Sequence, residues 1–317
     1  MLTARHDPDS WRARVRGCLL AGALGDSLGR PFEGEWAVTE HAVAEVLSGA
    51  GALTWTDDTS LMVALAEHLA GLPETTDLDD EALARSFARA WHAEPHRGYG
   101  ANPPRIFAAV LTGGDWRDLA RDSFGGAGSL GNGGAMRAAP VGALPGGPEH
   151  AADVARQTAA ITHAHPDGQD GAALIAVATW FCLRTRPDDL DPAELLSTVA
   201  GHLRSPSLIT ALDAVVAGLA EDEPADVARR TGTGIAAAEA APAALSAFLH
   251  HPADPVAAIT FAVAMGGDTD TVATMSGCLS GALVGEQRLP DGLVARLEAA
   301  SRIRAVADAL AERTYRP

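Results

Sequence analysis

Apolar residues recur at the spacing of α-helices along almost the whole chain, and this pattern constrains the fold most. Leu83, Phe87 and Trp91 stand four residues apart, and residues 293–310 show a comparable pattern that predicts one last helix. Such spacing places apolar side chains on one face of a helix. No run of alternating β-branched residues indicates a strand, and no fixed-period repeat is visible. We therefore expect an all-α fold of about a dozen helices.

The core of this fold must rely on close approach of backbones, because only 5% of the residues are aromatic while 33 are glycine. Gly17, Ala21 and Gly25 recur every four positions, as on a helix face that packs against another backbone. The preceding arginines imitate a signal peptide, but the apolar stretch is short, and we interpret it as the first core helix. Residues 271–285 are too few and too glycine-rich to span a bilayer, so we expect no membrane contact.

The length of 317 residues allows one large domain or two small ones, and the proline-rich segment 187–192 is the best candidate for a boundary. We predict a single domain over residues 1–317 and a monomer. The formal net charge is −17, and all 24 cationic residues are arginines. This charge argues against an extended nucleic-acid-binding surface, although a modified nucleotide could still be a substrate. The lack of lysine excludes P-loop and Schiff-base chemistry.

Three cysteines, Cys18, Cys182 and Cys278, are far apart in the sequence and lie in apolar runs. Their odd number and surroundings favour buried free thiols over a disulfide or a zinc site. Free thiols are typical of a reducing compartment, so we expect a cytoplasmic protein.

Two clusters of carboxylates and hydroxyls, 210 residues apart, each precede an apolar helical stretch; they comprise Thr56, Asp57, Asp58 and Thr59, and Asp268, Thr269, Asp270 and Thr271. They could be helix N-caps, which need one side-chain oxygen each. Several oxygens per cluster also suit hard cations such as Mg²⁺, provided that the fold brings the clusters together. The second cluster also fits a phosphatase motif. Phosphatases of that type, however, place the motif after a strand and have a longer sequence following it.

A glycine-rich segment and a histidine pair complete the candidate features. Six of the eleven residues 125–135 are glycine, so this segment is either a flexible surface loop or a backbone concavity that binds an anion. Residues 135–139 read as a helix start, which would favour phosphate. His163 and His165 lack further metal ligands at useful spacing, and we expect a turn with one of them facing a pocket. Residues 232–234 form a weak GxG without a preceding strand and receive no nucleotide role.

Taken together, these motifs resemble the ADP-ribosylglycohydrolase family, the ADP-ribosyl-acceptor hydrolases that include dinitrogenase-reductase-activating glycohydrolase. The matching segments follow the family's order over nearly the whole chain: residues 17–26 with Glu33 downstream, 55–59, 97–100, 131–137, 162–163 and 267–271. The resemblance implies a compact, single-domain, orthogonal helical bundle. It also implies an enzyme that cleaves the C1″ glycosidic bond between ADP-ribose and an acceptor, which is a protein side chain, a nucleic acid or a small molecule.

The same resemblance implies two Mg²⁺ or Mn²⁺ ions, and the family's metal ligands fall on Thr56, Asp57, Asp58, Asp268, Asp270 and Thr271. The ADP-ribose-binding positions fall on Phe124, Gly128, Ser129, Gly131, Asn132, Gly133, Met136 and His163. Phe124 stands where some members stack an aromatic ring on adenine, and Leu130 stands where a number of relatives carry tyrosine.

Cleavage of the glycosidic bond develops oxocarbenium character on the ribose. One carboxylate must also transfer a proton during this cleavage. We assign this role to Glu33, with Asp268 as a metal ligand that could also activate water. Without the resemblance, Glu33 reads as a solvated loop carboxylate, since Pro31 should end the first helix and leave residues 32–36 as a loop. The alternative for the whole chain is an inactive ADP-ribose-binding or structural member of the same fold. The acceptor cannot be read from the sequence.

Overall fold

The computed structural model describes residues 7–73, 78–220 and 223–316, and within these ranges it is all-α. Seventeen α-helices and five short 3₁₀ helices are present there, with two isolated β-bridges and no strand. The α-helices are α1 (Pro8–Gly29), α2 (Glu40–Ser48), α3 (Asp57–Ala70), α4 (Asp80–Ala93), α5 (Pro103–Leu111), α6 (Trp116–Arg121), α7 (Ser123–Gly126), α8 (Pro148–Ala160), α9 (Pro166–Arg184), α10 (Pro192–Ala200), α11 (Pro206–Gly218), α12 (Pro224–Thr231), α13 (Ala237–His250), α14 (Pro255–Ala264), α15 (Thr269–Val284), α16 (Asp291–Arg296) and α17 (Ala300–Thr314). The 3₁₀ helices are η1 (Arg30–Phe32), η2 (Asn132–Gly134), η3 (Ala139–Ala143), η4 (Pro187–Asp189) and η5 (Glu286–Arg288).

The predicted fold class is confirmed, but the chain is divided into more helices than expected. The expected last helix is wrong, because it is two helices, α16 and α17, with Ala299 between them at φ 53°. Leu53 explains the break: its N–H donates to Arg296 O at 2.9 Å, and its carbonyl accepts from Glu298 N–H at 2.9 Å. This bridge draws the backbone out of the helical path.

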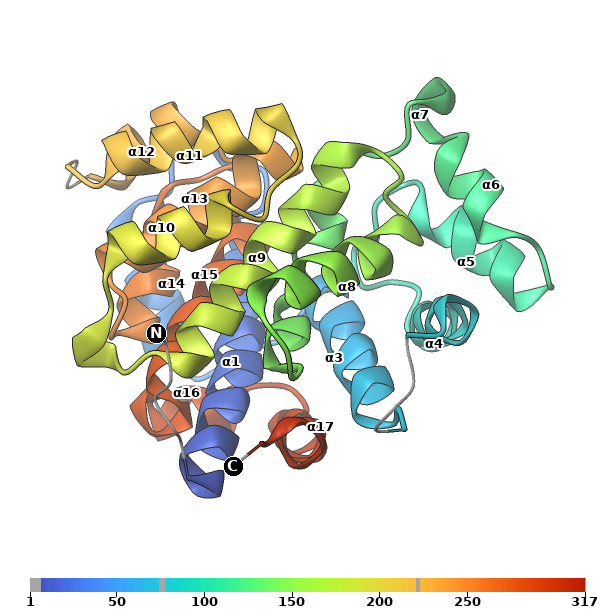
Figure 1. Ribbon diagram of the computed structural model, residues 1–317. Helices are drawn as coiled ribbons and strands as arrows, with labels where there is room; N and C mark the ends of the chain where they lie inside the picture. Colours follow the sequence, from blue (N-terminus) through green and yellow to red (C-terminus); the bar gives the residue numbers. More distant parts are fainter. Residues whose placement is uncertain (1–6, 74–77, 221–222, 317) are drawn as a thin grey trace.

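Helices α1 and α15 form the centre of the molecule and lie side by side (Figure 1). Their contact is made by glycines on both sides. A Cβ atom at Gly17 would overlap Gly281 O, and one at Gly25 would overlap Ala273 O. The expectation that the small-residue face of the first helix packs against another backbone is therefore confirmed. Because α1 and α15 come from opposite ends of the chain, this contact joins its two halves.

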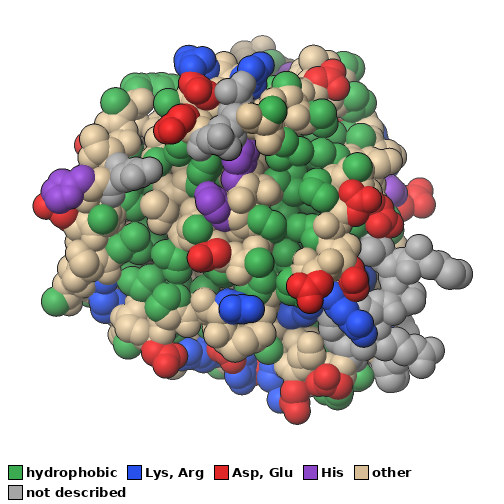
Figure 2. All heavy atoms as spheres, turned by 90° about the vertical axis from the view of Figure 1, so that its left-hand side faces the viewer, with side chains coloured by type: hydrophobic (Ala, Val, Ile, Leu, Met, Phe, Trp, Pro, Cys, Tyr) green, Lys and Arg blue, Asp and Glu red, His purple; other side chains and the backbone are tan. Residues whose placement is uncertain are grey.

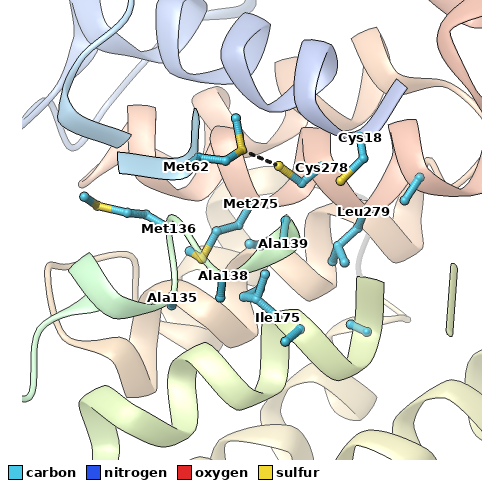
Figure 3. Close-up of a cluster of buried hydrophobic side chains, with 14 of the residues drawn as sticks. Cys18, Met62, Ala135, Met136, Ala138, Ala139, Ile175, Met275, Cys278 and Leu279 are labelled. Carbon is cyan, nitrogen blue, oxygen red and sulfur yellow. Dashed lines mark hydrogen bonds between the residues drawn. The ribbon is translucent and has the colours of Figure 1, made fainter. Parts of the chain in front are cut away.

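The side chains beside this helix pair are rich in sulfur (Figure 3). Cys278 of α15 points toward Met62 of α3, with 3.6 Å between Sγ and Sδ, and Cys18 of α1 lies beside it. All three cysteines are buried and free, as the sequence predicts. Met136 lies at the edge of the same cluster, which connects the core to the cavity described below.

One continuous hydrophobic core unites the helices on both sides of residues 187–192, so this candidate position is not a domain boundary. Figure 1 shows α4–α7 on one flank of the central helices and α10–α12 on the other. The end points of the predicted domain 1–317 stay a prediction, since residues 1–6 and 317 lie outside the described part.

The distribution of arginines and the apolar character of the helices bear on binding to nucleic acids and to membranes. On the face shown in Figure 2, arginines are scattered among acidic and apolar side chains and form no broad basic patch. Across the described residues, none of the helices has the length and apolar character needed to cross a membrane.

Candidate functional site

A cavity of about 470 Å³ is lined by all the residues that the resemblance assigns to the site. Both acidic clusters, the glycine-rich segment, His163 and Glu33 line it together, although they come from distant parts of the chain. The predicted residues on its wall are Glu33, Thr56, Asp57, Asp58, Phe124, Gly128, Ser129, Gly131, Asn132, Gly133, Met136, His163, Asp268, Asp270 and Thr271. The two clusters are thus brought to one place, which the metal hypothesis requires.

The first cluster is held at the start of α3 by a buried carboxylate from α1. Asp26 accepts hydrogen bonds from the N–H groups of Thr56, at 2.9 Å, and Thr59, at 3.0 Å, and from the Thr59 hydroxyl at 2.6 Å. Thr56 is also the N-cap of α3, since its hydroxyl accepts from Asp58 N–H at 3.3 Å. Capping therefore accounts for Thr56, while the carboxylates of Asp57 and Asp58 remain to be explained.

Arg97 fixes the chain that enters this cluster. Its guanidinium lies 3.7 Å from the centre of the Trp55 ring and donates to Trp55 O at 3.0 Å. It also binds the Glu298 carboxylate through both Nη atoms, at 2.9 and 2.7 Å. The Arg97 carbonyl accepts from Asp57 N–H at 2.8 Å. The motif at 97–100 thus orients Asp57 without itself supplying a cavity carboxylate.

The second cluster begins at a double-glycine turn in front of α15. Gly266 and Gly267 have φ of 74° and 81°, a region that favours glycine. Gly267 exchanges backbone hydrogen bonds of 2.8 Å with Gly34 and Glu35, so the loop that carries Glu33 is tied to the second cluster. Asp268 is the N-cap residue of α15, yet its side chain makes no capping hydrogen bond. Its carboxylate is therefore available to the cavity.

The crowded carboxylates shift one another's pKa. Burial, followed by the charge of Asp26, raises the pKa of Asp57 to about 7. Burial and the charge of Asp268 raise the pKa of Asp270 to about 9. The pKa of Asp58 is raised well above its ordinary value by burial and by Asp270. Such shifts follow when negative charges share a site without a nearby cation, and a bound divalent cation would oppose them.

This donor set fits a hard divalent cation. Asp58 Oδ2 is buried and has no hydrogen-bond partner, which is costly unless a ligand satisfies it. Carboxylate and hydroxyl oxygens are the donors that Mg²⁺ prefers. Among the described residues, however, no group of three or more Asp, Glu, His or Cys side chains converges as a ready-made metal site. The two observations agree if each ion takes one or two carboxylates and keeps several waters, as Mg²⁺ usually does.

The glycine-rich segment forms a tight wall of the cavity. Gly128 has φ 75°, and a Cβ there would lie 2.6 Å from His165 N. A Cβ at Gly133 would lie 2.8 Å from His163 Cε1. Gly131 has φ −66°, so its own backbone does not require glycine. The expected helix start at 135–139 is wrong: only η2 and η3 form here, because Pro140 and the glycines permit no longer helix.

Phe124 precedes this wall in an unusual conformation. Its φ is 54°, rare for a bulky residue, and its side chain is 69% exposed although it lines the cavity. Backbone strain of this kind is found mainly at functional sites. Leu130 also lines the cavity and is exposed.

Asn132 and Glu33 both stand next to Asp268. Asn132 Nδ2 donates to Asp268 Oδ2 at 2.7 Å, which links the glycine wall to the second cluster. Glu33 is exposed at the edge of the cavity. Its partial desolvation, followed by the negative charge of Asp268, raises its pKa, while Arg30 acts in the opposite direction.

One of the two histidines lines the cavity and the other does not, as expected. His163 is buried and lines the cavity. His165 is the N-cap of α9, where its Nδ1 accepts from Asp167 N–H at 3.1 Å.

Sequence reasoning missed several residues of the site. Ile235 lines the cavity and is 75% exposed, in the loop next to residues 232–234. That loop joins the two walls, because Ile235 O accepts from Asn132 N–H at 2.9 Å and Thr233 O from Asp268 N–H at 2.7 Å. Arg137 also lines the cavity while fully buried. The glycines at 232 and 234 were the available signal for the loop.

Comparisons with known proteins show what this chain is similar to. The family described as ADP-ribosylglycohydrolase matches residues 7–317. ADP-ribosylhydrolase ARH3 of Gallus gallus is 31% identical over 346 residues, with 95% of this chain and 93% of the relative covered. ADP-ribosylhydrolase ARH3 of Mus musculus is 30% identical over 328 residues, covering 88% and 86%. A solved structure described as an ADP-ribosylglycohydrolase-related protein complex aligns with a TM-score of 0.74 at 25% identity, covering 97% of this chain and all of that one.

Proposed function

Because the chain belongs to the ADP-ribosylglycohydrolase family, we propose that it hydrolyses the bond between C1″ of ADP-ribose and an acceptor. The observation that carries this proposal is the single cavity that both acidic clusters and the glycine wall line together. A carboxylate-rich end suits a ribose whose bond is being broken, and a wall of backbone N–H groups suits a diphosphate.

We further propose that two Mg²⁺ or Mn²⁺ ions are held by Thr56, Asp57, Asp58, Asp268, Asp270 and Thr271. When bound, such ions supply contacts to ribose hydroxyls and a water of lowered pKa. Asp26 supports this end of the cavity by holding the backbone of Thr56 and Thr59. Asn132 supports it from the other side by orienting the Asp268 carboxylate.

The remainder of ADP-ribose would extend along the glycine wall. Gly128 and Gly133 line the cavity and have no side chain that could keep a diphosphate away from the backbone. Neutral backbone N–H groups on this wall could bind the diphosphate despite the net charge of −17. Phe124, Leu130 and Ile235 are the exposed large apolar side chains that the described residues contribute to the cavity, and they could cover a base. We assign adenine to them because an aromatic ring and an aliphatic chain both pack well on a flat base.

Glu33 is the proposed proton-transfer residue. Its pKa is raised, which moves a carboxyl group toward the pH at which general acid–base help is most effective. The two hydrogen bonds between Gly267 and the Glu33 loop keep this carboxylate close to Asp268. Asp268 and a nearby water provide the simpler alternative route.

The competing proposal is a member that binds ADP-ribose without cleaving it. The presence of all six proposed ligand positions favours an enzyme. The deciding experiment offers ADP-ribosylated arginine, serine and nucleic-acid substrates and quantifies free ADP-ribose, with Mg²⁺, with Mn²⁺ and with EDTA. Metal-dependent release from at least one substrate supports the enzyme and identifies the acceptor. Tight binding of ADP-ribose without release from any of them supports the binder.

A further inference from the structure

A buried arginine without a carboxylate partner lies behind the glycine wall. Arg137 is fully buried, and no salt bridge to it occurs among the described residues. Its Nη1 donates to Gly133 O at 2.9 Å, and its Nη2 donates to Thr158 O at 3.1 Å and to Thr162 Oγ1 at 2.8 Å. The guanidinium also lies 4.6 Å from the centre of the Phe87 ring. Burial of an unpaired cation is costly, so its contacts call for a reason beyond packing.

The hydrogen bond from Arg137 to Thr162 determines which atom donates in the next hydrogen bond, between Thr162 and His163. A guanidinium has only donors, so the Thr162 oxygen must accept from Arg137. The hydroxyl proton is then left for the one other partner of Thr162 Oγ1, which is His163 Nδ1 at 2.7 Å. If Nδ1 donated instead, the Thr162 oxygen would accept twice and its own proton would be buried without an acceptor, which is costly. Nδ1 of His163 is therefore assigned as the acceptor in this pair. A neutral imidazole that accepts at Nδ1 carries its proton on Nε2.

The second ring nitrogen of His163, Nε2, lies beside the glycine wall of the cavity that His163 itself lines. A Cβ at Gly133 would lie 3.1 Å from Nε2, and one at Gly131 would lie 3.5 Å from it, and both glycines line the cavity. No described residue forms a hydrogen bond with Nε2. Burial, followed by the positive charge of Arg137, lowers the pKa of His163 to about 3, so the ring is neutral at ordinary pH.

We propose that Arg137 and Thr162 are positioning residues that lock His163 as the neutral Nε2–H tautomer, so that it offers one donor to an oxygen of the ligand. A ligand oxygen of a ribose or a phosphate can accept this proton, whereas a group that only donates cannot bind there. The identity of that ligand as ADP-ribose rests on the proposed function, but the tautomer does not.

Two variants of Thr162 distinguish the effect of its hydroxyl from the effect of its packing. Thr162→Val keeps the shape and removes the hydroxyl, and Thr162→Ser keeps the hydroxyl. Thr158→Val is the matched control, because it removes another buried hydroxyl, which donates to Ala155 O at 2.9 Å and has no hydrogen bond with His163. The backbone carbonyl of residue 158, which accepts from Arg137, is kept in this variant.

The first measurement is ¹⁵N NMR of the ligand-free, histidine-labelled protein, with the His163 signals identified by their absence in His163→Gln. We expect the wild type, Thr162→Ser and Thr158→Val to show a protonated Nε2 and an unprotonated Nδ1 from pH 5.5 to 8. Thr162→Val should show a mixture of tautomers. A wild-type His163 that is protonated at Nδ1 overturns the proposal, whether or not the variants fold.

The second measurement is calorimetry of ADP-ribose binding in the presence of Mg²⁺. Loss of one well-oriented hydrogen bond should weaken binding to Thr162→Val about tenfold. Thr162→Ser and Thr158→Val should stay within about twofold of the wild type. Equal affinity of Thr162→Val and wild type overturns the role of the lock in binding. If the wild type binds no ADP-ribose, the proposed function fails, and the NMR spectrum still decides the tautomer.

Discussion

The glycine contact between α1 and α15 leads to a prediction opposite to that of helix propensity. Gly25→Ala should by itself stabilise an isolated helix by about 1 kcal/mol. In the folded protein the new Cβ would overlap Ala273 O and lie 2.8 Å from Thr274 N. Because both obstacles are backbone atoms, the two helices must separate. Overpacking costs about 1–3 kcal/mol, and the upper end applies where no side chain can turn away.

Subtracting the propensity gain leaves a net loss of about 2 kcal/mol, which lowers Tm by about 3 °C in a chain of this size. Gly17→Ala should cost about as much, since its Cβ would lie 2.7 Å from Gly285 Cα. Gly218→Ala is the matched control: its Cβ would meet Ser246 Oγ only at 3.6 Å, so this variant should be neutral or more stable by up to about 1 kcal/mol.

The position of each glycine along α15 separates stability from function. Ala273 lies one turn from Asp270, whereas Gly285 lies beyond the other end of α15. Gly25→Ala should therefore also weaken metal-dependent turnover, while Gly17→Ala should lower Tm alone. Thermal unfolding by circular dichroism, with and without Mg²⁺, and a turnover assay measure both effects. A Gly25→Ala protein as stable as Gly218→Ala would refute the packing argument.

Four further predictions concern the cavity. Asp57→Ala should abolish turnover with little change in helical circular dichroism, and Mg²⁺ should raise Tm of the wild type but not of this variant; full activity in EDTA would contradict this. Glu33→Gln cannot transfer a proton and should lose roughly 10²-fold in kcat with little change in ADP-ribose affinity; a wild-type rate would leave Asp268 with water as the simpler mechanism. Phe124→Ala should weaken ADP-ribose binding by about 1–3 kcal/mol in calorimetry, the range for base–aromatic stacking, and an unchanged affinity would remove it from the base site. His163 has a folded pKa of about 3, below that of an unfolded histidine, so its contribution to stability is present above about pH 6.5 and is lost as the pH falls toward 3. His163→Gln should therefore flatten the fall of Tm between pH 7 and pH 4.5, and the exposed-site control His41→Gln should not; equal slopes in all three proteins would count against a buried neutral His163.

The sequence by itself determined the helical class and the chemical content of the site. Helical periodicity and capping residues act over a few positions, so local spacing is enough to predict α4 or the start of α3. The recurrence of Gly17, Ala21 and Gly25 likewise predicts a close helix contact, because only small side chains allow one. The acidic clusters and the glycine-rich segment were visible for the same reason: their residue types are unusual at short range.

Only the tertiary structure decided which groups meet and how they are oriented. Asp26 and Arg137 lie far in sequence from Thr59 and Thr162, and no local pattern states that they pair. Packing against Leu53 divides the last helical segment at Ala299, which overrides its periodicity. The glycines of α1 and α15 let two helices from opposite ends of the chain approach closely. Asp26 of α1 holds the first acidic cluster, and the second lies at the start of α15. The spacing of small residues on α1 predicts that a close contact forms, but its partner lies more than 200 residues away, and no local pattern identifies it.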